Sequence, residues 1–489
     1  MSPSRPWLTP VSRVLAVAVV AGAGVVGADR IGAAPEATSA PDGASSAATT
    51  LTTSYCPGDP FAGEAEDSPA VDVTGAIDAM AAPGEVLDGV VSPSDDPGRI
   101  TVEELSKASA TDPKDSSESG PTQVSRDELG AESVRVRGTG ERAPGLVATE
   151  SFTASGEDVQ GLAALPCAAP TADAWLVAGG GDRGRQERLV LTNPGGNAVS
   201  ARVEAVGADG GGDAKDRSVV VPAGGRSTVL LDSLGGTEAP QAVHVTTTGG
   251  LVAPVIVDQH LDGLTPAGVD VVGPTAQPGT RLVLPGNANG SDRGLVIAAP
   301  GDRDAVVQVR RLSEDAARSA EVVTVPAGEV FDVDLETSDG MRSWVVESDE
   351  PVVAASWTRA EGTQGRSDMA WSVATPAIGR LAGVALPSAS ADDARTFVEV
   401  TAADAPAEVE VLVSRDGEVS TEEVSLDEAR SKALPVGRAD AVWVRPVSGR
   451  VHSAALVLSA PGAQEAQAAS LPLLPSRVAV RDVPVVQAR

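Results

Sequence analysis

The sequence predicts an all-β protein in which tandem immunoglobulin-like β-sandwich modules follow an N-terminal signal or anchor and a disordered tether. From Trp175 onward, short Val-rich runs are separated by Gly, Pro, Asn and Asp at the spacing typical of a sandwich. Apolar and acidic residues alternate within these runs, as in Val409-Glu410-Val411, which places each kind on one face of a strand. Helix signals are nearly absent, and residues 426–433 form the only fair candidate for a helix.

Residues 1–34 are predicted to be a signal peptide or an N-terminal membrane anchor. Arg5 and Arg13 precede an apolar run from Val14 to Ala28, which is the pattern of an export signal. As a helix this run spans about 22 Å, which is shorter than the roughly 30 Å hydrocarbon core of a bilayer. Length therefore favours a cleaved signal peptide, although local bilayer thinning leaves an uncleaved anchor open. We expect an extracytoplasmic protein, secreted or anchored to the cell membrane by this segment.

Three further regions are defined by composition. Residues 35–54 are rich in Ala, Ser, Thr and Pro, with almost no large apolar residue, so we expect a disordered tether. Residues 55–170 contain strand-like pieces around a polar, acidic stretch, which predicts a small β-rich region with a disordered insertion at 92–122. Residues 476–489 are predicted to form a C-terminal tail.

Cys56 and Cys167 are the only two cysteines of the chain. Export places them in an oxidising compartment, where an even number of cysteines usually indicates a disulfide. No His, Asp or second Cys stands at ligand spacing near either residue, which argues against a metal site or a reactive thiol. We therefore expect a disulfide that stabilises the region 55–170.

Two turn motifs recur at an offset near one hundred residues. Asn193-Pro194-Gly195 returns as Ala299-Pro300-Gly301, each followed by a Val-rich strand. The tetrapeptide at 221–224, Val-Pro-Ala-Gly, returns unchanged at 325–328. Identical turns at matching positions indicate that the same supersecondary unit is repeated.

A third repeat consists of two Val residues separated by one position, with another Val seven residues later. Its copies have the same spacing, with a Trp in the first place of the middle copy: Val243, Val245 and Val252; Trp344, Val346 and Val353; Val442, Val444 and Val451. The final valines are 353 − 252 = 101 and 451 − 353 = 98 positions apart, which is about the length of one sandwich domain. We predict modules at 171–275, 276–378 and 379–475, of which the last is the most divergent.

Composition excludes some classes of partner. The chain has 37 basic and 68 acidic residues among 489, a formal net charge of −31, which opposes binding to phosphate backbones and to anionic lipid surfaces. We expect no nucleic-acid partner, and membrane contact only through the N-terminal segment. Aromatic residues make up 2% of the chain, so the cores must be aliphatic and stacking surfaces for sugars are scarce. Oligomeric state is left open.

The three histidines, His244, His260 and His452, do not form a catalytic signature. His244 and His452 follow buried positions of the repeat strands, so we interpret both as solvated strand residues. His260 has Asp258 two positions before it on the same strand face, an arrangement that permits an Asp–His pair. No activated nucleophile accompanies this pair, and we therefore predict no catalytic residue.

Metal and cofactor motifs are also lacking in the sequence. Asp332, Asp334 and Glu336 alternate with apolar residues, which indicates a solvated strand face, and no EF-hand loop is present. The glycine run 179–181 lacks the Lys and the following helix of a phosphate-binding loop. We expect no cofactor and no metal, while calcium in the loops stays open. A pair of carboxylates contributed by distant strands, as in a glycosidase, also stays open.

Several of these motifs together resemble a known family. Cys56-Pro57-Gly58, Cys167, Trp175 ahead of a Gly-rich turn, and Leu191–Gly195 with the later Val-Pro-Ala-Gly are similar to an uncharacterised family of exported proteins from high-GC Gram-positive bacteria. That family carries a domain of unknown function. The resemblance implies a secreted or membrane-anchored envelope protein and implies no activity or ligand.

Two functional hypotheses follow. The first is a non-enzymatic extracytoplasmic protein whose sandwich modules act as a scaffold and binding protein for an unknown envelope protein or glycan. The alternative is an envelope-polymer hydrolase, or an accessory to a glycosyl-transfer system, with an unrecognised carboxylate site. A concave cluster of two acids and a Trp would favour the alternative.

Overall fold

A computed structural model describes residues 46–61, 72–92, 94–105, 114–116, 122–125, 132–156, 158–179, 183–207, 216–234, 240–288, 292–315, 317–335, 340–363, 366–460 and 462–481. The predicted signal or anchor at 1–34 lies outside these residues. The chain divides into two units, of which one spans residues 48–479 and the other includes the described residues 46–47 and 480–481. A search of the described part of the chain finds no helix of the length and apolarity that a membrane span requires.

The unit of residues 48–479 contains four copies of one eight-stranded β-sandwich. In each copy the strand order is 1-6-3-4 in one sheet and 5-2-7-8 in the other. The first copy comprises β2 (Leu51–Cys56), β3 (Asp72–Met80), β4 (Ile100–Glu104), β5 (Lys114–Ser116), β6 (Thr122–Ser125), β7 (Val134–Thr139), β8 (Val147–Ser155) and β9 (Gln160–Pro166). The second comprises β10 (Asp173–Ala178), β11 (Arg185–Asn193), β12 (Val199–Gly207), β13 (Asp216–Val221), β14 (Gly225–Leu230), β15 (Gln241–Thr248), β16 (Ala253–Asp262) and β17 (Thr265–Val272).

The remaining copies follow the same order. The third comprises β18 (Gly279–Asn287), β19 (Asp292–Ala298), β20 (Ala305–Leu312), β21 (Ala317–Val325), β22 (Val330–Asp334), β23 (Arg342–Glu361), which serves both sheets as their sixth and seventh strands, and β24 (Ser367–Val373). The fourth comprises β25 (Ala382–Ala385), β26 (Arg395–Ala402), β27 (Ala407–Arg415), β28 (Glu418–Leu426), β29 (Arg430–Pro435), β30 (Ala441–Ser448), β31 (His452–Leu458) and β32 (Ala468–Pro472), with β33 (Leu474–Pro475) beside β25. Short β1 (Ser46–Ala48) pairs with β34 (Ala479–Arg481).

The all-β class and the sandwich architecture are confirmed. The strand order shares with immunoglobulin domains the pairing of the second strand with the fifth and of the third with the sixth. It differs at the edges, because the first strand lies beside the sixth and the seventh lies beside the second. The predicted immunoglobulin-like strand pairing is therefore found only in the two central pairs of strands.

The region before residue 171 differs from the sequence prediction. It holds a complete first copy of the sandwich rather than an unrelated small β-rich region. Residues 46–48 and 51–54, expected in a disordered tether, are strand, and β4 lies inside the expected insertion 92–122, where it pairs with β7. The predicted tail contains β34. Backbone pairing along a sheet thus orders segments whose side chains alone gave little indication of structure.

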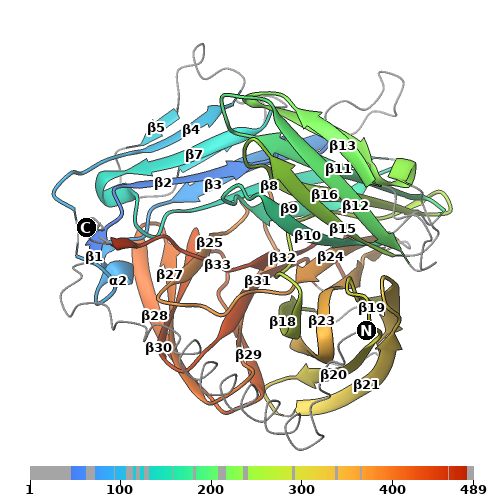
Figure 1. The fold of residues 1–489 in the computed structure, drawn as a ribbon. Helices are drawn as coiled ribbons and strands as arrows, with labels where there is room; N and C mark the ends of the chain where they lie inside the picture. Colours follow the sequence, from blue (N-terminus) through green and yellow to red (C-terminus); the bar gives the residue numbers. More distant parts are fainter. Residues whose placement is uncertain are drawn as a thin grey trace, which may run out of the picture. The chain divides into compact units, whose positions relative to one another are not determined.

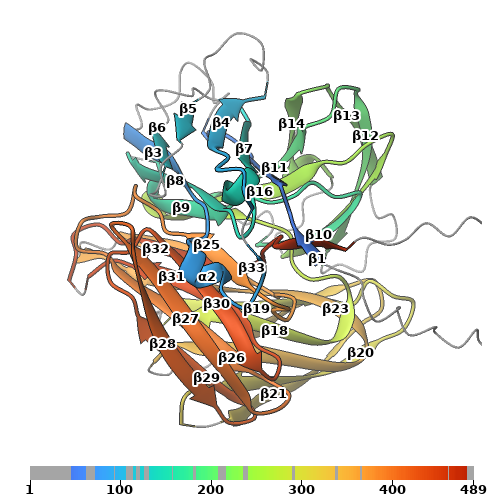
Figure 2. The same ribbon diagram turned by 90° about the vertical axis from the view of Figure 1, so that its left-hand side faces the viewer.

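The predicted helix at 426–433 is wrong. Leu426 ends β28 and Arg430 begins β29, with Ala429 in a left-handed turn between them at a φ of 55°. The helical elements of the described residues are short: α2 (Gly84–Leu87) and two single turns of 3-10 helix, Gly140–Arg142 and Leu231–Leu234. In Figure 2, α2 lies beside β25 and β30, and the Arg445 guanidinium of β30 donates to three carbonyl groups in and just after α2.

The repeated turns contact each other within a sandwich. The Asn193 side-chain amide donates to the carbonyl groups of Val221 and Pro222, while its oxygen accepts the Gly195 N–H. The Gly224 N–H donates to Gly195 O at 3.0 Å, and in the third copy the Gly328 N–H donates to Ala299 O at 2.8 Å. The two motifs therefore recur together because one turn satisfies the backbone of the other.

The Val-x-Val repeat marks the sandwich cores. All nine of its residues are buried. Eight pack in the core of their own copy, whereas Val353 of the third copy packs against the core of the second. A fully buried Val side chain contributes about 1.5–3 kcal/mol. The aliphatic cores expected from the scarcity of aromatic residues are thus observed in each of the three copies.

The four sandwiches contact one another in cyclic order through their eighth strands. β9 contacts β17 and β32, and β24 also contacts β17 and β32. Figure 1 shows β9, β24 and β32 close to one another. We call β9, β17, β24 and β32 the central strands. Contacts between the first and fourth sandwiches close the cycle, through an apolar cluster that contains Met80, Val147 and Trp443.

Candidate functional site

The central strands meet at one buried carboxylate, that of Asp368 in β24. Its Oδ2 accepts the N–H groups of Leu162 and Ala468, both at 2.8 Å, and its Oδ1 accepts those of Val269 at 3.2 Å and Met369 at 2.9 Å. Each donor belongs to a different central strand. We call this arrangement the central hub. Burial raises the pKa of Asp368 to about 8, against the lowering effect of the four N–H donors.

Two glycines make room for the hub. A Cβ atom on Gly161 would lie 2.0 Å from Asp368 Oδ1, and one on Gly268 would lie 2.5 Å from the Met369 nitrogen. Both glycines also have positive φ values, 142° and 128°, a backbone conformation that other residues adopt with strain. The hub therefore requires glycine at the equivalent positions of β9 and β17.

A pocket opens where the central strands end. It has a volume of about 280 Å³ and is lined mainly by apolar side chains, and every central strand contributes to it. Its lining includes Leu165 and Pro166 of β9, Val271 and Val272 of β17, Trp371 and Val373 of β24, and Ser470 and Pro472 of β32. We call this the central pocket. An apolar concavity with few polar groups is the usual form of a small-ligand site.

A network of polar groups lies behind the Trp371 wall of the central pocket. The Trp371 indole donates to Asp258 Oδ2 at 2.7 Å, and the Trp371 N–H donates to Asp270 Oδ2 at 2.7 Å. Arg185 Nε donates to Asp258 Oδ1 at 2.9 Å. Burial raises the pKa of Asp270 well above its usual range. These bonds join the second and third sandwiches and hold the indole against the pocket.

A second concavity lies between the first and fourth sandwiches. It has a volume of about 390 Å³, and its polar lining includes Asp78, Arg415, Arg438 and Asp440. We call this the polar pocket. Asp78 Oδ2 accepts the N–H and the hydroxyl of Ser388, both at 2.8 Å. Burial raises the pKa of Asp78 to about 6, with a further contribution from Asp440, whose own pKa is raised by burial.

His260 does not form the predicted pair with Asp258. Its Nδ1 instead accepts a hydrogen bond from Arg359 Nη2 at 3.1 Å, while Asp258 binds Arg185 and Trp371. Burial, followed by the charges of Arg185 and Arg359, lowers the pKa of His260. The neutral imidazole accepts a hydrogen bond from arginine, and this bond is a structural contact between the second and third sandwiches.

The other two histidines are less exposed than predicted. His244 is half-buried and stacks on Trp175, with ring centroids 4.3 Å apart, and its Nε2 lies 3.3 Å from Asp173 Oδ1. His452 is buried, so its interpretation as a solvated residue is wrong, and its Nδ1 lies 2.9 Å from Thr375 O. Burial lowers the pKa of His452 to about 4.

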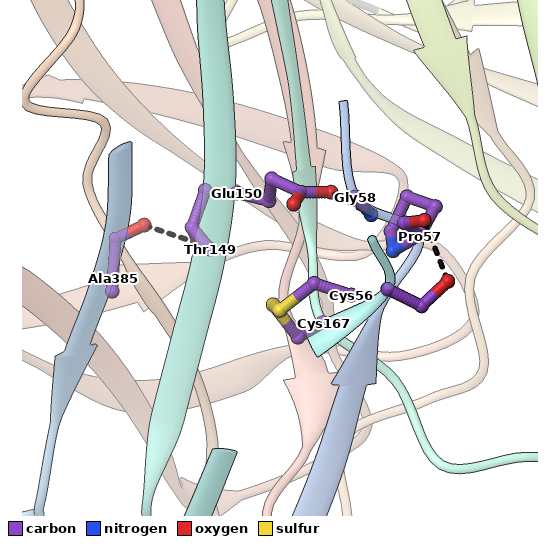
Figure 3. The surroundings of a disulfide bond; sticks show 8 residues. Cys56, Pro57, Gly58, Thr149, Glu150, Cys167 and Ala385 are labelled. Atoms are coloured by element: carbon purple, nitrogen blue, oxygen red, sulfur yellow. Dashed lines mark hydrogen bonds between the residues drawn. A yellow bond between two sulfur atoms is a disulfide. The ribbon is translucent and has the colours of Figure 1, made fainter. Parts of the chain in front are cut away.

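The structure pairs Cys56 with Cys167, as the sequence predicted. The bond joins the end of β2 to the residue after β9, and so links the two sheets of the first sandwich. Figure 3 shows that Glu150 and Thr149 point to opposite sides of β8 near this bond. Glu150 Oε2 accepts the Gly58 N–H at 3.1 Å, and the Thr149 hydroxyl donates to Ala385 O of the fourth sandwich at 2.6 Å. A disulfide indicates a non-cytoplasmic environment.

Burial also separates the Trp residues by role. Trp344 lies in the core of the third sandwich, Trp443 is buried in the apolar cluster between the first and fourth sandwiches, and Trp357 is half-buried. Trp371 is buried and also lines the central pocket. Within the ranges that the structure covers, no group of three or more His, Cys, Asp or Glu side chains is placed to hold a metal ion.

The comparison with protein families gives one match. The model of a family of unknown function, DUF5719, matches residues 122–437. The chain belongs to this family. The match begins in the first sandwich of the DUF5719 member and ends after β29 of the fourth, so it includes Asp368 and most strands of the cyclic unit. A search of curated proteins finds no match.

Sequence reasoning missed both the hub and the pockets. Asp368 looks like any polar residue at the start of a strand, and backbone N–H donors carry no sequence signature. One signal was available for the first sandwich of the DUF5719 member: Val134 and Val136 repeat the Val-x-Val pair. In the first sandwich, the residue that corresponds to the last Val of the repeat is Leu146, which is buried and directly precedes β8. It lies ten rather than seven positions after Val136, because the single turn Gly140–Arg142 is inserted.

Proposed function

We propose that this DUF5719 member is a non-enzymatic extracytoplasmic protein that acts as a scaffold and binding protein at the cell envelope, either secreted or held to the membrane by residues 1–34. Its binding site is the central pocket, which receives an apolar group of an envelope partner. The observation that carries the proposal is the position of this pocket, lined by all four central strands. A site built on four mutually bonded strands is held rigid before a ligand arrives, which lowers the entropic cost of binding.

The chemistry of the central pocket supports binding rather than catalysis. Its only ionisable lining residues among those described are Asp173 and Tyr55, and neither has an activated nucleophile beside it in the lining. An apolar concavity can bury an apolar ligand group for about 25 cal/mol per Å² of surface removed from water.

The test compares the full exported chain with a variant that fills the pocket. Ala169 is exposed and lines the central pocket, so Ala169→Trp should obstruct it, whereas Ala223→Trp places the same side chain on an exposed turn elsewhere. Binding of a small apolar fluorescent dye should be lost in Ala169→Trp and retained in Ala223→Trp. Equal binding by both variants would overturn the proposal that the central pocket is the site.

The polar pocket is the candidate site of a second function, hydrolysis of an envelope polymer. Its lining holds Asp78 and Asp440, and the charge of Asp440 contributes to the raised pKa of Asp78; pairs of carboxylates serve as acid and base in glycosidases. Two features argue against it. Asp78 Oδ2 already accepts two hydrogen bonds from Ser388, and no aromatic side chain is among the described lining residues. Hydrolysis of purified cell-wall polymer that disappears in Asp440→Asn would favour this second function.

A further inference from the structure

The central pocket has no basic group in its described lining. Its charged residue is Asp173, whose side chain is 52% exposed. The remaining polar lining residues are Tyr55, Thr171, Gln277 and Ser470. The opening of the pocket therefore offers a negative charge and hydroxyl or amide groups, but no cation to receive an anionic ligand.

Prolines make the pocket lining poor in hydrogen-bond donors. Five of the lining residues are prolines, which have a carbonyl group and no N–H: Pro57, Pro166, Pro254, Pro274 and Pro472. Pro166 and Pro472 end two of the central strands. Because φ is fixed in proline, this lining is also stiff. A lining with few N–H donors is a poor match for an anionic group next to the apolar group of a ligand.

Charge complementarity extends this argument from the pocket to the whole chain. The formal net charge is −31, so the long-range field attracts cations and repels anionic lipid headgroups. Complementary charge mainly raises the rate of association and selects the partner. The apolar lining then decides which group of that partner is buried.

We propose that the occupant of the central pocket is one large apolar side chain presented by a basic segment of a partner protein, with Lys or Arg beside it. This inference rests on the proposed function, since it names the partner of the same site. A volume of about 280 Å³ accommodates one such side chain. The flanking cationic residues lie next to Asp173.

Short synthetic peptides test the partner class with the full exported chain. The first peptide has a central Phe flanked by Lys residues, the second replaces the Lys residues with Glu, and the third replaces Phe with Ser. Binding measured by calorimetry should be detected for the first peptide and weakened by about tenfold to a hundredfold for the third. The Glu peptide should not bind. Raising the salt concentration from about 0.05 M to about 0.3 M should lower the affinity for the Lys peptide.

Matched variants locate the interaction. Asp173→Asn should lower the affinity for the Lys peptide by about twofold to fivefold, which is the contribution typical of an exposed ion pair. Asp302→Asn, on an exposed turn outside the pocket lining, should leave its affinity unchanged. Ala169→Trp should abolish binding of the Lys peptide, whereas Ala223→Trp should not.

The outcomes separate this inference from the proposed function. Equal affinity for the Lys and Glu peptides, with dye binding still lost in Ala169→Trp, overturns the basic partner and leaves the pocket as a binding site. Binding to anionic phosphatidylglycerol vesicles that Ala169→Trp abolishes also overturns it, in favour of a lipid. Absence of both dye and peptide binding in the wild-type chain overturns the proposed function itself.

Discussion

The Asp368 carboxylate accepts the backbone N–H of Leu162 at 2.8 Å, although the two residues are 206 positions apart and belong to different sandwiches. The same carboxylate also bonds to the second and fourth sandwiches. One side chain thus couples all four copies. A buried N–H group that loses its acceptor costs about 1–3 kcal/mol, so this contact is worth more than its small area indicates.

Asp368→Ala should destabilise the chain severely. It leaves buried N–H groups on four strands without their acceptor, and each unsatisfied group costs about 1–3 kcal/mol. Asp368→Asn, which keeps one acceptor oxygen but turns an NH₂ group toward the donors, should give a smaller loss. Urea unfolding measures both, with the exposed Asp302→Ala as the control. A loss below about 1 kcal/mol in Asp368→Ala would contradict the role of the hub.

Glu150 should make folding stability depend on pH. Burial raises its pKa from 4.5 to about 8, so the folded chain holds this proton more tightly than the unfolded chain does. Its contribution to stability is therefore present below about pH 4.5 and is lost as the pH rises toward about 8. Glu150→Gln keeps an acceptor for the Gly58 N–H and removes the titration.

The measurement is the free energy of unfolding in urea from about pH 5 to about pH 8. The difference between Glu150→Gln and the wild type should grow across this window, in favour of the variant. His452, whose pKa is lowered to about 4, destabilises both chains equally as the pH falls below 6.5, so it cancels in the difference. Glu408→Gln, an exposed residue, is the control. A constant difference between Glu150→Gln and the wild type would show that burial does not hold this proton.

Removal of the disulfide should destabilise the first sandwich. The bond closes a separation of 111 residues, and loss of such a bond typically costs about 2–5 kcal/mol. The double variant Cys56→Ser with Cys167→Ser should lower the urea midpoint, and proteolysis should cut first between residues 46 and 166. Intact mass with and without reductant checks the pairing. Two free thiols in the purified wild-type chain would show that the bond is not formed.

Trp443→Phe should loosen the contact between the first and fourth sandwiches. The Trp443 indole donates to Gly145 O at 3.0 Å across this interface, and loss of the donor leaves a buried carbonyl group without a partner, at a cost of about 1–3 kcal/mol. Trp344→Phe, in the core of the third sandwich, is the matched control. Hydrogen exchange should increase in α2 and β25 only in Trp443→Phe. The same increase in both variants would indicate a general loss of stability.

Local patterns in the sequence predict much of the fold. The Val-x-Val repeat marks buried strands, and the turns at Asn193–Gly195 and 221–224 mark strand ends, because each depends on residues close together in the chain. The predictions of a solvated His452 and of a helix at 426–433 are wrong because tertiary packing, rather than the local pattern, determines the burial of His452 and the conformation of the segment. His452 contacts Thr375 of another sandwich, which alternation along one strand cannot reveal. The hub and both pockets arise only when separate sandwiches meet, so no local pattern encodes them.

The central hub also sets an order of events during synthesis. Its four donors range from Leu162 to Ala468, so the Asp368 carboxylate cannot reach its full set of partners until the fourth sandwich has been made. Chains fold domain by domain as they emerge, and exposed edges favour aggregation. Although β9 and β24 are each paired within their own sandwich, they therefore lack part of their final contacts until the fourth sandwich has been made.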